Sequence, residues 1–112
     1  MAAATPRAAL LLAVAAALCG AAVPAAAQDA AAGRAKAQSC TVCHGALGLS
    51  VTPDAPNLAG QPAIYLAAQL RAYRSGERKH EVMAVMAKPL SDDDIRNLAA
   101  WFNSIKVEAT AP

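Results

Sequence analysis

The residues best suited to chemistry in this chain are two cysteines three positions apart, Cys40 and Cys43, followed directly by His44. Two thiols on one turn of chain can add to the two vinyl groups of a single haem, and the adjacent imidazole then points along the axial direction of the iron. The sequence therefore predicts one covalently bound haem c, with Cys40 and Cys43 forming two thioether bonds and His44 ligating the metal.

Three other kinds of site use a cysteine pair at this spacing, and each fits the sequence less well. A thioredoxin-type redox site lies in a strand-helix-strand context, whereas the residues near Cys40 show almost no alternating strand pattern. A closed zinc site usually has a second pair of ligands at short spacing, but only His80 remains beyond the motif in the exported chain. A structural disulfide here would close too small a loop to stabilise the fold much.

Residues 1–27 have the pattern of a cleavable secretory signal peptide. Arg7 provides a positive start, residues 8–22 form an unbroken small and apolar run, and three alanines precede Gln28 as a small-residue cleavage site. We therefore expect an exported, periplasmic protein in which residues 28–112 form one monohaem domain.

Two other interpretations of this leader are disfavoured. An uncleaved membrane span would need a longer apolar run to cross ~30 Å of hydrocarbon, and no stop-transfer charges follow at once. Lipid attachment at Cys19 would require a smaller residue than Leu18 before it. We expect no stable membrane insertion after cleavage.

The charge balance argues against a nucleic-acid partner. Ten Lys and Arg face eight Asp and Glu, for a net charge of +2, whereas nucleic-acid-binding domains are strongly basic. One local basic run consists of Arg71, Arg74, Arg78 and Lys79. The sequence leaves open whether this run is a solvated helix end or a patch that docks a partner.

The rest of the chain reads as short helices joined by loops, which predicts an all-α fold. Asp29 is placed to cap a helix over residues 30–39, in which Gly33 suggests close packing against another backbone or a ring. Glycines and prolines punctuate residues 45–60, which predicts a loop wrapped around the haem.

Two further helices are predicted in the second half of the chain. Pro62 begins one that Gly76 ends, with an apolar face at helical spacing. Ser91 is placed to cap the last helix. Three aspartates follow it in the first turn, and an apolar stripe runs from Ile95 to Ile105. The tail from Val107 onward has no pattern.

The second iron ligand is expected in residues 81–87, between these two helices. A His/Met-ligated iron is typical of electron-carrying cytochromes, and Met83 and Met86 are the methionines that remain after export. His80 is the rival ligand, although a lone histidine beside basic residues is more often a surface residue. The residues alone leave the choice between Met83 and Met86 open.

The ordered set of motifs resembles the class I cytochromes c, within them the small bacterial group of cytochrome c-553 and the halves of cytochrome c4. The resemblance covers roughly residues 30–105. It rests on the segments Cys40-Thr41-Val42-Cys43-His44-Gly45, Pro56-Asn57-Leu58-Ala59-Gly60-Gln61, Tyr65-Leu66, Gln69-Leu70, and Met83 through Leu90-Ser91-Asp92-Asp93-Asp94-Ile95 to Leu98-Ala99-Ala100-Trp101-Phe102.

The resemblance implies a class I cytochrome c fold of about three to five short helices around one haem. It implies Met83 as the distal ligand and a crossing of the first and last helices at Gly33 and Trp101. Candidate partners of the haem propionates are Arg71, Tyr65 and Asn57.

The function implied is that of a periplasmic respiratory electron carrier, not an enzyme, which docks transiently to redox proteins such as an oxidase, a reductase or a dehydrogenase. Two alternatives are a haem subunit of a periplasmic dehydrogenase complex and, further away, a sensor or small enzyme with an open iron site. Methionine ligation would close the iron to substrate and argues against the latter.

Overall fold

The computed structural model describes residues 28–112, in which every regular element is helical. The predicted signal peptide, residues 1–27, lies outside this part of the chain. The elements are α1 (Ala30–Lys36), the 3₁₀ helix η1 (Ala37–Cys40), α2 (Thr41–His44), α3 (Ala63–Ser75), α4 (Glu81–Ala87) and α5 (Asp92–Ser104). The prediction of an all-α fold is confirmed, and no helix of the described residues is long and apolar enough to cross a membrane.

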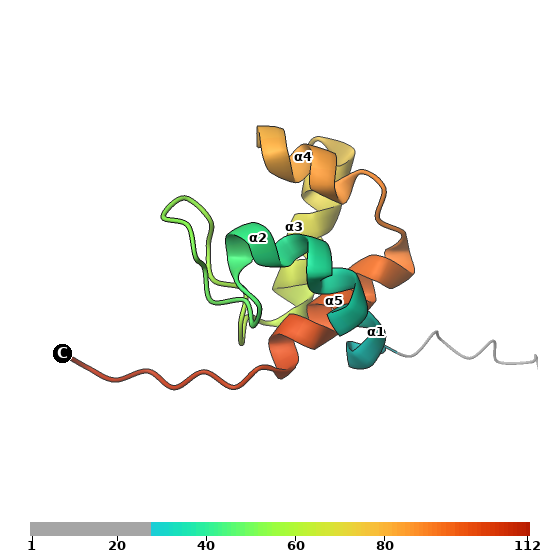
Figure 1. The fold of residues 1–112 in the computed structure, drawn as a ribbon. Coiled ribbons are helices and arrows are strands. Elements are labelled where there is room, and N and C mark those ends of the chain that lie inside the picture. Colours follow the sequence, from blue (N-terminus) through green and yellow to red (C-terminus); the bar gives the residue numbers. More distant parts are fainter. Residues whose placement is uncertain (1–27) are drawn as a thin grey trace, which may run out of the picture.

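The first and last helices, α1 and α5, cross in close contact (Figure 1). Gly33 makes the crossing possible, because a Cβ atom at this position would lie 1.9 Å from the carbonyl oxygen of Asn97 and 2.9 Å from Cβ of Trp101. Arg34 stacks over the Trp101 ring at 5.4 Å, and Lys36 forms an ion pair of 3.2 Å with Asp94. The predicted packing of Gly33 against Trp101 is therefore confirmed.

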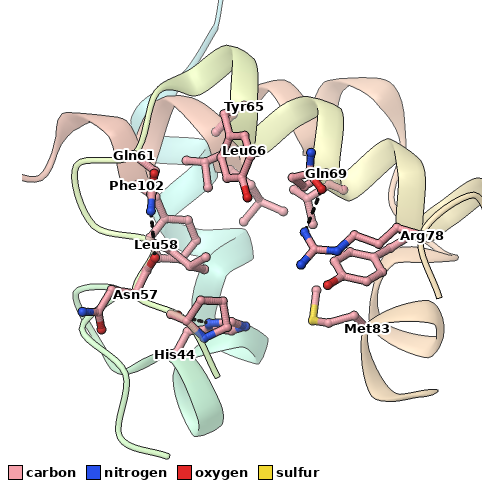
Figure 2. Close-up of a pocket in the computed structure, with 15 residues that line it drawn as sticks. His44, Asn57, Leu58, Gln61, Tyr65, Leu66, Gln69, Arg78, Met83 and Phe102 are labelled. Atoms are coloured by element: carbon pink, nitrogen blue, oxygen red, sulfur yellow. Dashed lines mark hydrogen bonds between the residues drawn. The ribbon is translucent and has the colours of Figure 1, made fainter. Parts of the chain in front are cut away.

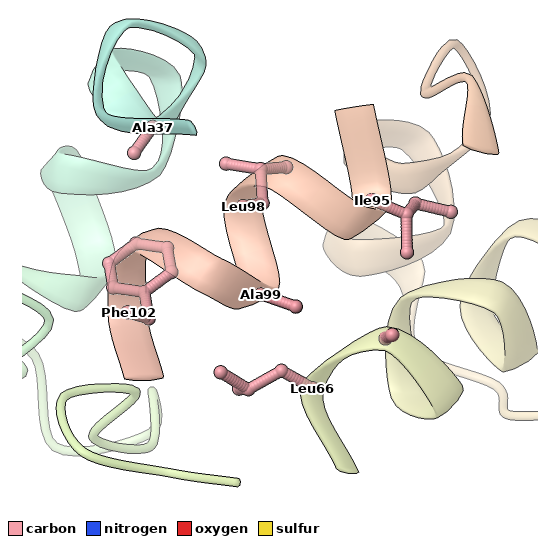
Figure 3. Close-up of a cluster of buried hydrophobic side chains, with 7 residues drawn as sticks. Ala37, Leu66, Ile95, Leu98, Ala99 and Phe102 are labelled. Carbon is pink, nitrogen blue, oxygen red and sulfur yellow. The ribbon is translucent and has the colours of Figure 1, made fainter. Parts of the chain in front are cut away.

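The buried hydrophobic core is formed by side chains from α5, α3 and η1 (Figure 3). From α5, Ile95 and Leu98 are almost fully buried. The other buried members are Ala37, Leu66, Ala67, Ala99 and Phe102. Several of these side chains are alanines, so the polypeptide contributes few large groups to its own core, which is expected for a small domain that binds a large prosthetic group.

The predicted helix over residues 30–39 is divided into α1 and η1 in the structure, and α2 follows directly. Asp29 caps α1 as expected, accepting hydrogen bonds from the amides of Ala31 and Ala32. The α-helix then tightens into 3₁₀ geometry at Ala37 and resumes at Thr41. Because a 3₁₀ turn has three residues per turn and an α-helix 3.6, the change rotates the side chains of the following segment relative to α1.

The boundaries of the last two long helices follow from the expected capping residues. Ser91 and Asp94 form a reciprocal capping box at the start of α5, each side chain bonding the other's backbone amide at 3.0 Å. Gly76 ends α3 in the left-handed conformation, with φ of 83°. The segment 81–87, where the second iron ligand was expected, forms the short helix α4 packed against α3.

The loop of residues 45–60 folds back over the end of α2 (Figure 1). The amide of Val51 donates to the carbonyl of Cys43, and the amides of Leu58 and Ala59 donate to the carbonyl of Gly48. Gly60 then joins the loop to α5 through a 2.8 Å bond from its amide to the Phe102 carbonyl. These bonds fix the loop beside the cysteine and histidine motif.

Candidate functional site

His44 is the buried polar residue of the site. It ends α2, is only 8% exposed, and donates a 2.8 Å hydrogen bond from Nδ1 to the carbonyl oxygen of Pro56. A carbonyl oxygen can only accept, so the proton of the neutral ring lies on Nδ1 and the lone pair on Nε2. A histidine oriented in this way by a backbone carbonyl is prepared to bind a metal through Nε2.

Cys40 and Cys43 lie one helical turn apart, at the end of η1 and in α2. Both are half-buried free thiols, so the structure gives no disulfide between them. Burial raises the pKa of the Cys40 thiol, which keeps it neutral at physiological pH. Both cysteines and His44 line one cavity, which is the arrangement that double attachment of a single ring requires.

Two cavities adjoin at His44 and Met83. One of about 150 Å³ is bounded mainly by α3, α5 and the loop, and the other of about 450 Å³ by η1, α2, α4 and the loop. Five residues line both, namely His44, Pro56, Tyr73, Arg78 and Met83. Figure 2 shows the imidazole of His44 and the thioether of Met83 facing the same space from opposite sides.

The other two candidate ligands occupy different places. Met86 lines only the larger cavity. His80 also lines it, but its side chain caps α4, where Nδ1 accepts a 3.2 Å hydrogen bond from the amide of Met83. In the neutral ring this bond leaves the proton on Nε2, so neither nitrogen of His80 has a free lone pair.

The position of α4 depends on contacts that Arg74 makes across the fold. Its guanidinium donates to the carbonyl of Leu90, at 2.9 Å, and to the carboxylate of Asp92, at 2.6 Å. The hydrogen bond and the charge of Arg74 lower the pKa of Asp92. The bonds tie the segment between α4 and α5 to α3, so this arginine of the basic run has a structural role.

The residues around the two cavities fit a haem. The walls are mostly apolar, with Leu58, Leu66, Leu70, Leu98 and Phe102 on the inner side, and they also include His44 and Met83, which could ligate an iron. The cysteines lie along one edge. Polar groups gather elsewhere on the wall, from Asn57, Gln61, Tyr65 and Gln69, where they suit the carboxylate side chains of the ring.

The structure separates the three candidate propionate partners. Tyr65 and Asn57 line the smaller cavity, whereas Arg71 lines neither. Asn57 also accepts a 2.7 Å bond from the amide of Ser50, which braces the loop. Sequence reasoning missed Arg78, which lines both cavities, because spacing along the chain grouped it with a surface run.

Two of the alternative uses of the cysteine pair, which the sequence already disfavoured, can be compared with the described residues. The regular elements there are helices, so the strand-helix-strand context of a thioredoxin-type site is missing from that part of the chain. Residues 28–112 also contain no group of three or more His, Cys, Asp and Glu side chains placed to hold a metal ion, as a zinc site would need.

Comparisons with known proteins identify the family of the chain. The sequence model of the cytochrome c family matches residues 30–106. Cytochrome c-554(548) of Halomonas halodenitrificans is 47% identical over 79 residues, covering 68% of this chain and 95% of that protein. The thiosulfate dehydrogenase electron acceptor of Thiomonas intermedia is 47% identical over 73 residues, covering 63% of this chain and 33% of that protein.

A solved structure agrees in fold as well as in sequence. The crystal structure of reduced cytochrome c4 from Pseudomonas stutzeri superimposes with a TM-score of 0.67 at 42% identity, covering 71% of this chain and 47% of that chain. The chain thus spans nearly all of one relative and less than half of the cytochrome c4 and electron acceptor proteins it matches. With the family match over residues 30–106 and the Cys40, Cys43 and His44 motif in place for a covalent haem c, this chain belongs to the cytochrome c family.

Proposed function

We propose that this protein is a periplasmic single-electron carrier whose haem iron is ligated by His44 and Met83. The observation that carries the proposal is that these two side chains, and neither Met86 nor His80, line both cavities and face each other across them (Figure 2). The bound haem supplies the one-electron ferric and ferrous couple.

The chain contributes by keeping both ligands in place during the reaction. The Pro56 carbonyl fixes the tautomer and ring orientation of His44. Met83 lies on a helix that is capped by His80 and packed on α3. Because both ligands are held by secondary structure, a change of one electron requires little rearrangement of the protein. Apolar walls exclude water and favour a neutral thioether as a ligand.

With both His44 and Met83 bound, the iron would have no open position for a substrate, which supports a carrier over an enzyme. Access for electrons comes instead from the rim of the larger cavity, where Val42 and Val82 are 76% and 54% exposed. A redox protein can approach the cofactor there, and we propose transient docking, because electron-transfer complexes bury small interfaces.

Optical spectra of the exported holoprotein, oxidised and dithionite-reduced, test the proposal. A closed His/Met iron gives sharp reduced c-type bands, the weak long-wavelength band of iron bonded to methionine sulfur in the oxidised state, and no reaction with carbon monoxide. Haem bands that lack the long-wavelength feature and shift with carbon monoxide would instead identify an open iron, as in a sensor or small enzyme.

A haem subunit of a periplasmic dehydrogenase complex is the second candidate function. The observation that favours it is the 47% identity to a protein named as the electron acceptor of thiosulfate dehydrogenase, of which this chain spans only a third. Size-exclusion chromatography of the protein from its native periplasm distinguishes the two. A free carrier elutes as a small protein, whereas a subunit elutes with a larger dehydrogenase at moderate salt.

A further inference from the structure

One residue of the basic run, Arg78, lines the proposed cofactor site. Among the residues that line either cavity, Arg78 is the only lysine or arginine. The smaller cavity has no carboxylate in its wall, and the larger has only Asp54. The other titratable groups of the two walls are His44, His80, Tyr65, Tyr73, Cys40 and Cys43.

The position of Arg78 follows from the end of α3. Gly76 turns the chain, and the amide of Arg78 then donates back to the Ala72 carbonyl at 3.0 Å. Its side chain donates a 2.7 Å bond from Nη1 to the amide oxygen of Gln69, and its guanidinium lies 4.7 Å from the centre of the Tyr73 ring. Gln69 and Tyr73, both on α3, therefore hold the cation at the wall of the cavity. Figure 2 shows the bond between Arg78 and Gln69.

We propose that Arg78 forms the ion pair with a propionate carboxylate of the haem, held in place by Gln69 and Tyr73. A haem bears two carboxylates, and a carboxylate enclosed by apolar walls needs a charged or hydrogen-bonding partner. Arginine suits this role because its guanidinium can donate two parallel hydrogen bonds to one carboxylate. Only one terminal nitrogen of Arg78, Nη1, donates to the Gln69 oxygen, so further N–H donors of the guanidinium stay available.

The pair has a consequence for the reduction potential. Reduction adds one negative charge to the cofactor, and a nearby fixed positive charge favours the reduced state. Loss of Arg78 should therefore lower the midpoint potential. This inference rests on the proposed placement of the haem in these cavities, but it does not depend on which partner the carrier serves.

The experiment compares the midpoint potentials of the Arg78→Gln and Arg71→Gln holoproteins with that of the unmodified protein. Arg71 is the matched control, because it carries the same charge and is exposed as Arg78 is, but it lies within α3 and lines neither cavity. We expect the oxidised-to-reduced ratio at a fixed solution potential to rise about tenfold in Arg78→Gln, which is ~59 mV for a one-electron couple. Arg71→Gln should change it much less.

Salt separates a contact pair from a distant charge. At ~1 M salt the screening length is ~3 Å, so the effect of the exposed Arg71 should disappear while that of a contact pair persists. Equal potentials of the two variants, or a difference that vanishes at this salt concentration, would overturn the proposal. The optical spectrum of each variant reports ligation by His44 and Met83 separately, so failure of the Arg78 assignment leaves the proposed ligands standing.

A conservative substitution covers the case in which Arg78→Gln yields no holoprotein. Arg78→Lys keeps the charge but loses the planar pair of donors, so its potential should fall by less, in the same direction. The control is Arg71→Lys, which should match the unmodified protein. If Arg78→Lys and Arg71→Lys have the same potential, the assignment of Arg78 to the carboxylate is wrong.

Discussion

At the scale of single residues, the hydrogen bonds of His44 and His80 decide which ring nitrogen has a lone pair available for a metal. The Pro56 carbonyl accepts a 2.8 Å hydrogen bond from Nδ1–H of His44, which leaves the lone pair on the other ring nitrogen. His80 has the opposite arrangement, since its Nδ1 accepts from the amide of Met83 at 3.2 Å. Two imidazoles near one cavity thus have different chemistry because their hydrogen bonds differ.

The choice of methionine is tested by two matched substitutions on α4. Met83→Ala should abolish the long-wavelength band of methionine-ligated iron, permit carbon monoxide binding, and lower the midpoint potential by an amount on the order of 0.1 V. We expect these three changes because Met83, which lines both cavities, is the proposed ligand of the iron. Visible spectroscopy with carbon monoxide titration, followed by a redox titration, provides the measurement.

Met86→Ala is the control. It removes the same kind of side chain one turn later in α4, and Met86 lines only the larger cavity. This variant should keep the long-wavelength band and remain unreactive toward carbon monoxide. The opposite pattern, with the band lost in Met86→Ala and kept in Met83→Ala, would make Met86 the ligand.

At the scale of helices, the crossing of α1 and α5 depends on Gly33, which has no side chain. Gly33→Ala should destabilise the fold by ~3 kcal/mol, because the new Cβ would overlap the Asn97 carbonyl and force the two helix backbones apart. Guanidinium unfolding of the holoprotein, followed by circular dichroism, measures this change.

Gly76→Ala controls for the intrinsic cost of replacing a glycine. At Gly76 the backbone is left-handed, but an added Cβ would meet nothing within 4 Å. The expected cost is therefore only the conformational strain, ~1 kcal/mol. Similar losses in both variants would argue against tight packing at the crossing.

The start of α5 gives the fold a specific dependence on acid. The hydrogen bond from the Ser91 amide, with help from Lys36, lowers the pKa of Asp94 below its usual range. A carboxylate with a lowered folded-state pKa stabilises the fold above its unfolded pKa of ~3.9, and this contribution is lost as pH falls through the folded-state value.

Replacement of this aspartate should remove that dependence. Asp94→Asn should be less stable than the unmodified protein at neutral pH, and the difference should shrink below pH ~4. Thermal unfolding across this pH range measures it. Asp93→Asn is the control, since it removes the same charge from the same helical turn outside the capping box. A stability difference for Asp94→Asn that stays constant down to the most acidic pH would refute the capping explanation.

At the scale of the whole molecule, the exported protein should consist of residues 28–112 and one covalently bound haem. The cysteine pair and the small-residue cleavage site before Gln28 both lead to this expectation. Intact mass spectrometry of the periplasmic protein under denaturing conditions should give the mass of this segment plus one haem. A haem that is extracted by acidified solvent, or a mass that retains the first 27 residues, would contradict it.

The amino-acid sequence by itself determined the cofactor chemistry and most of the helices. Cys40, Cys43 and His44 act through their local spacing, and the caps at Asp29 and Ser91 through their immediate neighbours. Such features need no knowledge of distant contacts, which is why pattern and spacing sufficed. Close packing at Gly33 was also predictable from the glycine itself, whereas its partner, the last helix at Trp101, was predicted from the family resemblance.

The tertiary structure alone decided which side chains share the cavity. Residues 44 and 83 lie far apart in the chain, and their facing positions depend on how α2 and α4 pack around α3 and α5. The basic run is a second case that spacing along the sequence could not resolve, because its residues are close in the chain but make different contacts. Arg74 forms hydrogen bonds with Leu90 and Asp92, whereas Arg78 lines the cavity. Charge along a sequence is one-dimensional, whereas the partner of each charge is set by the folding of the chain in three dimensions.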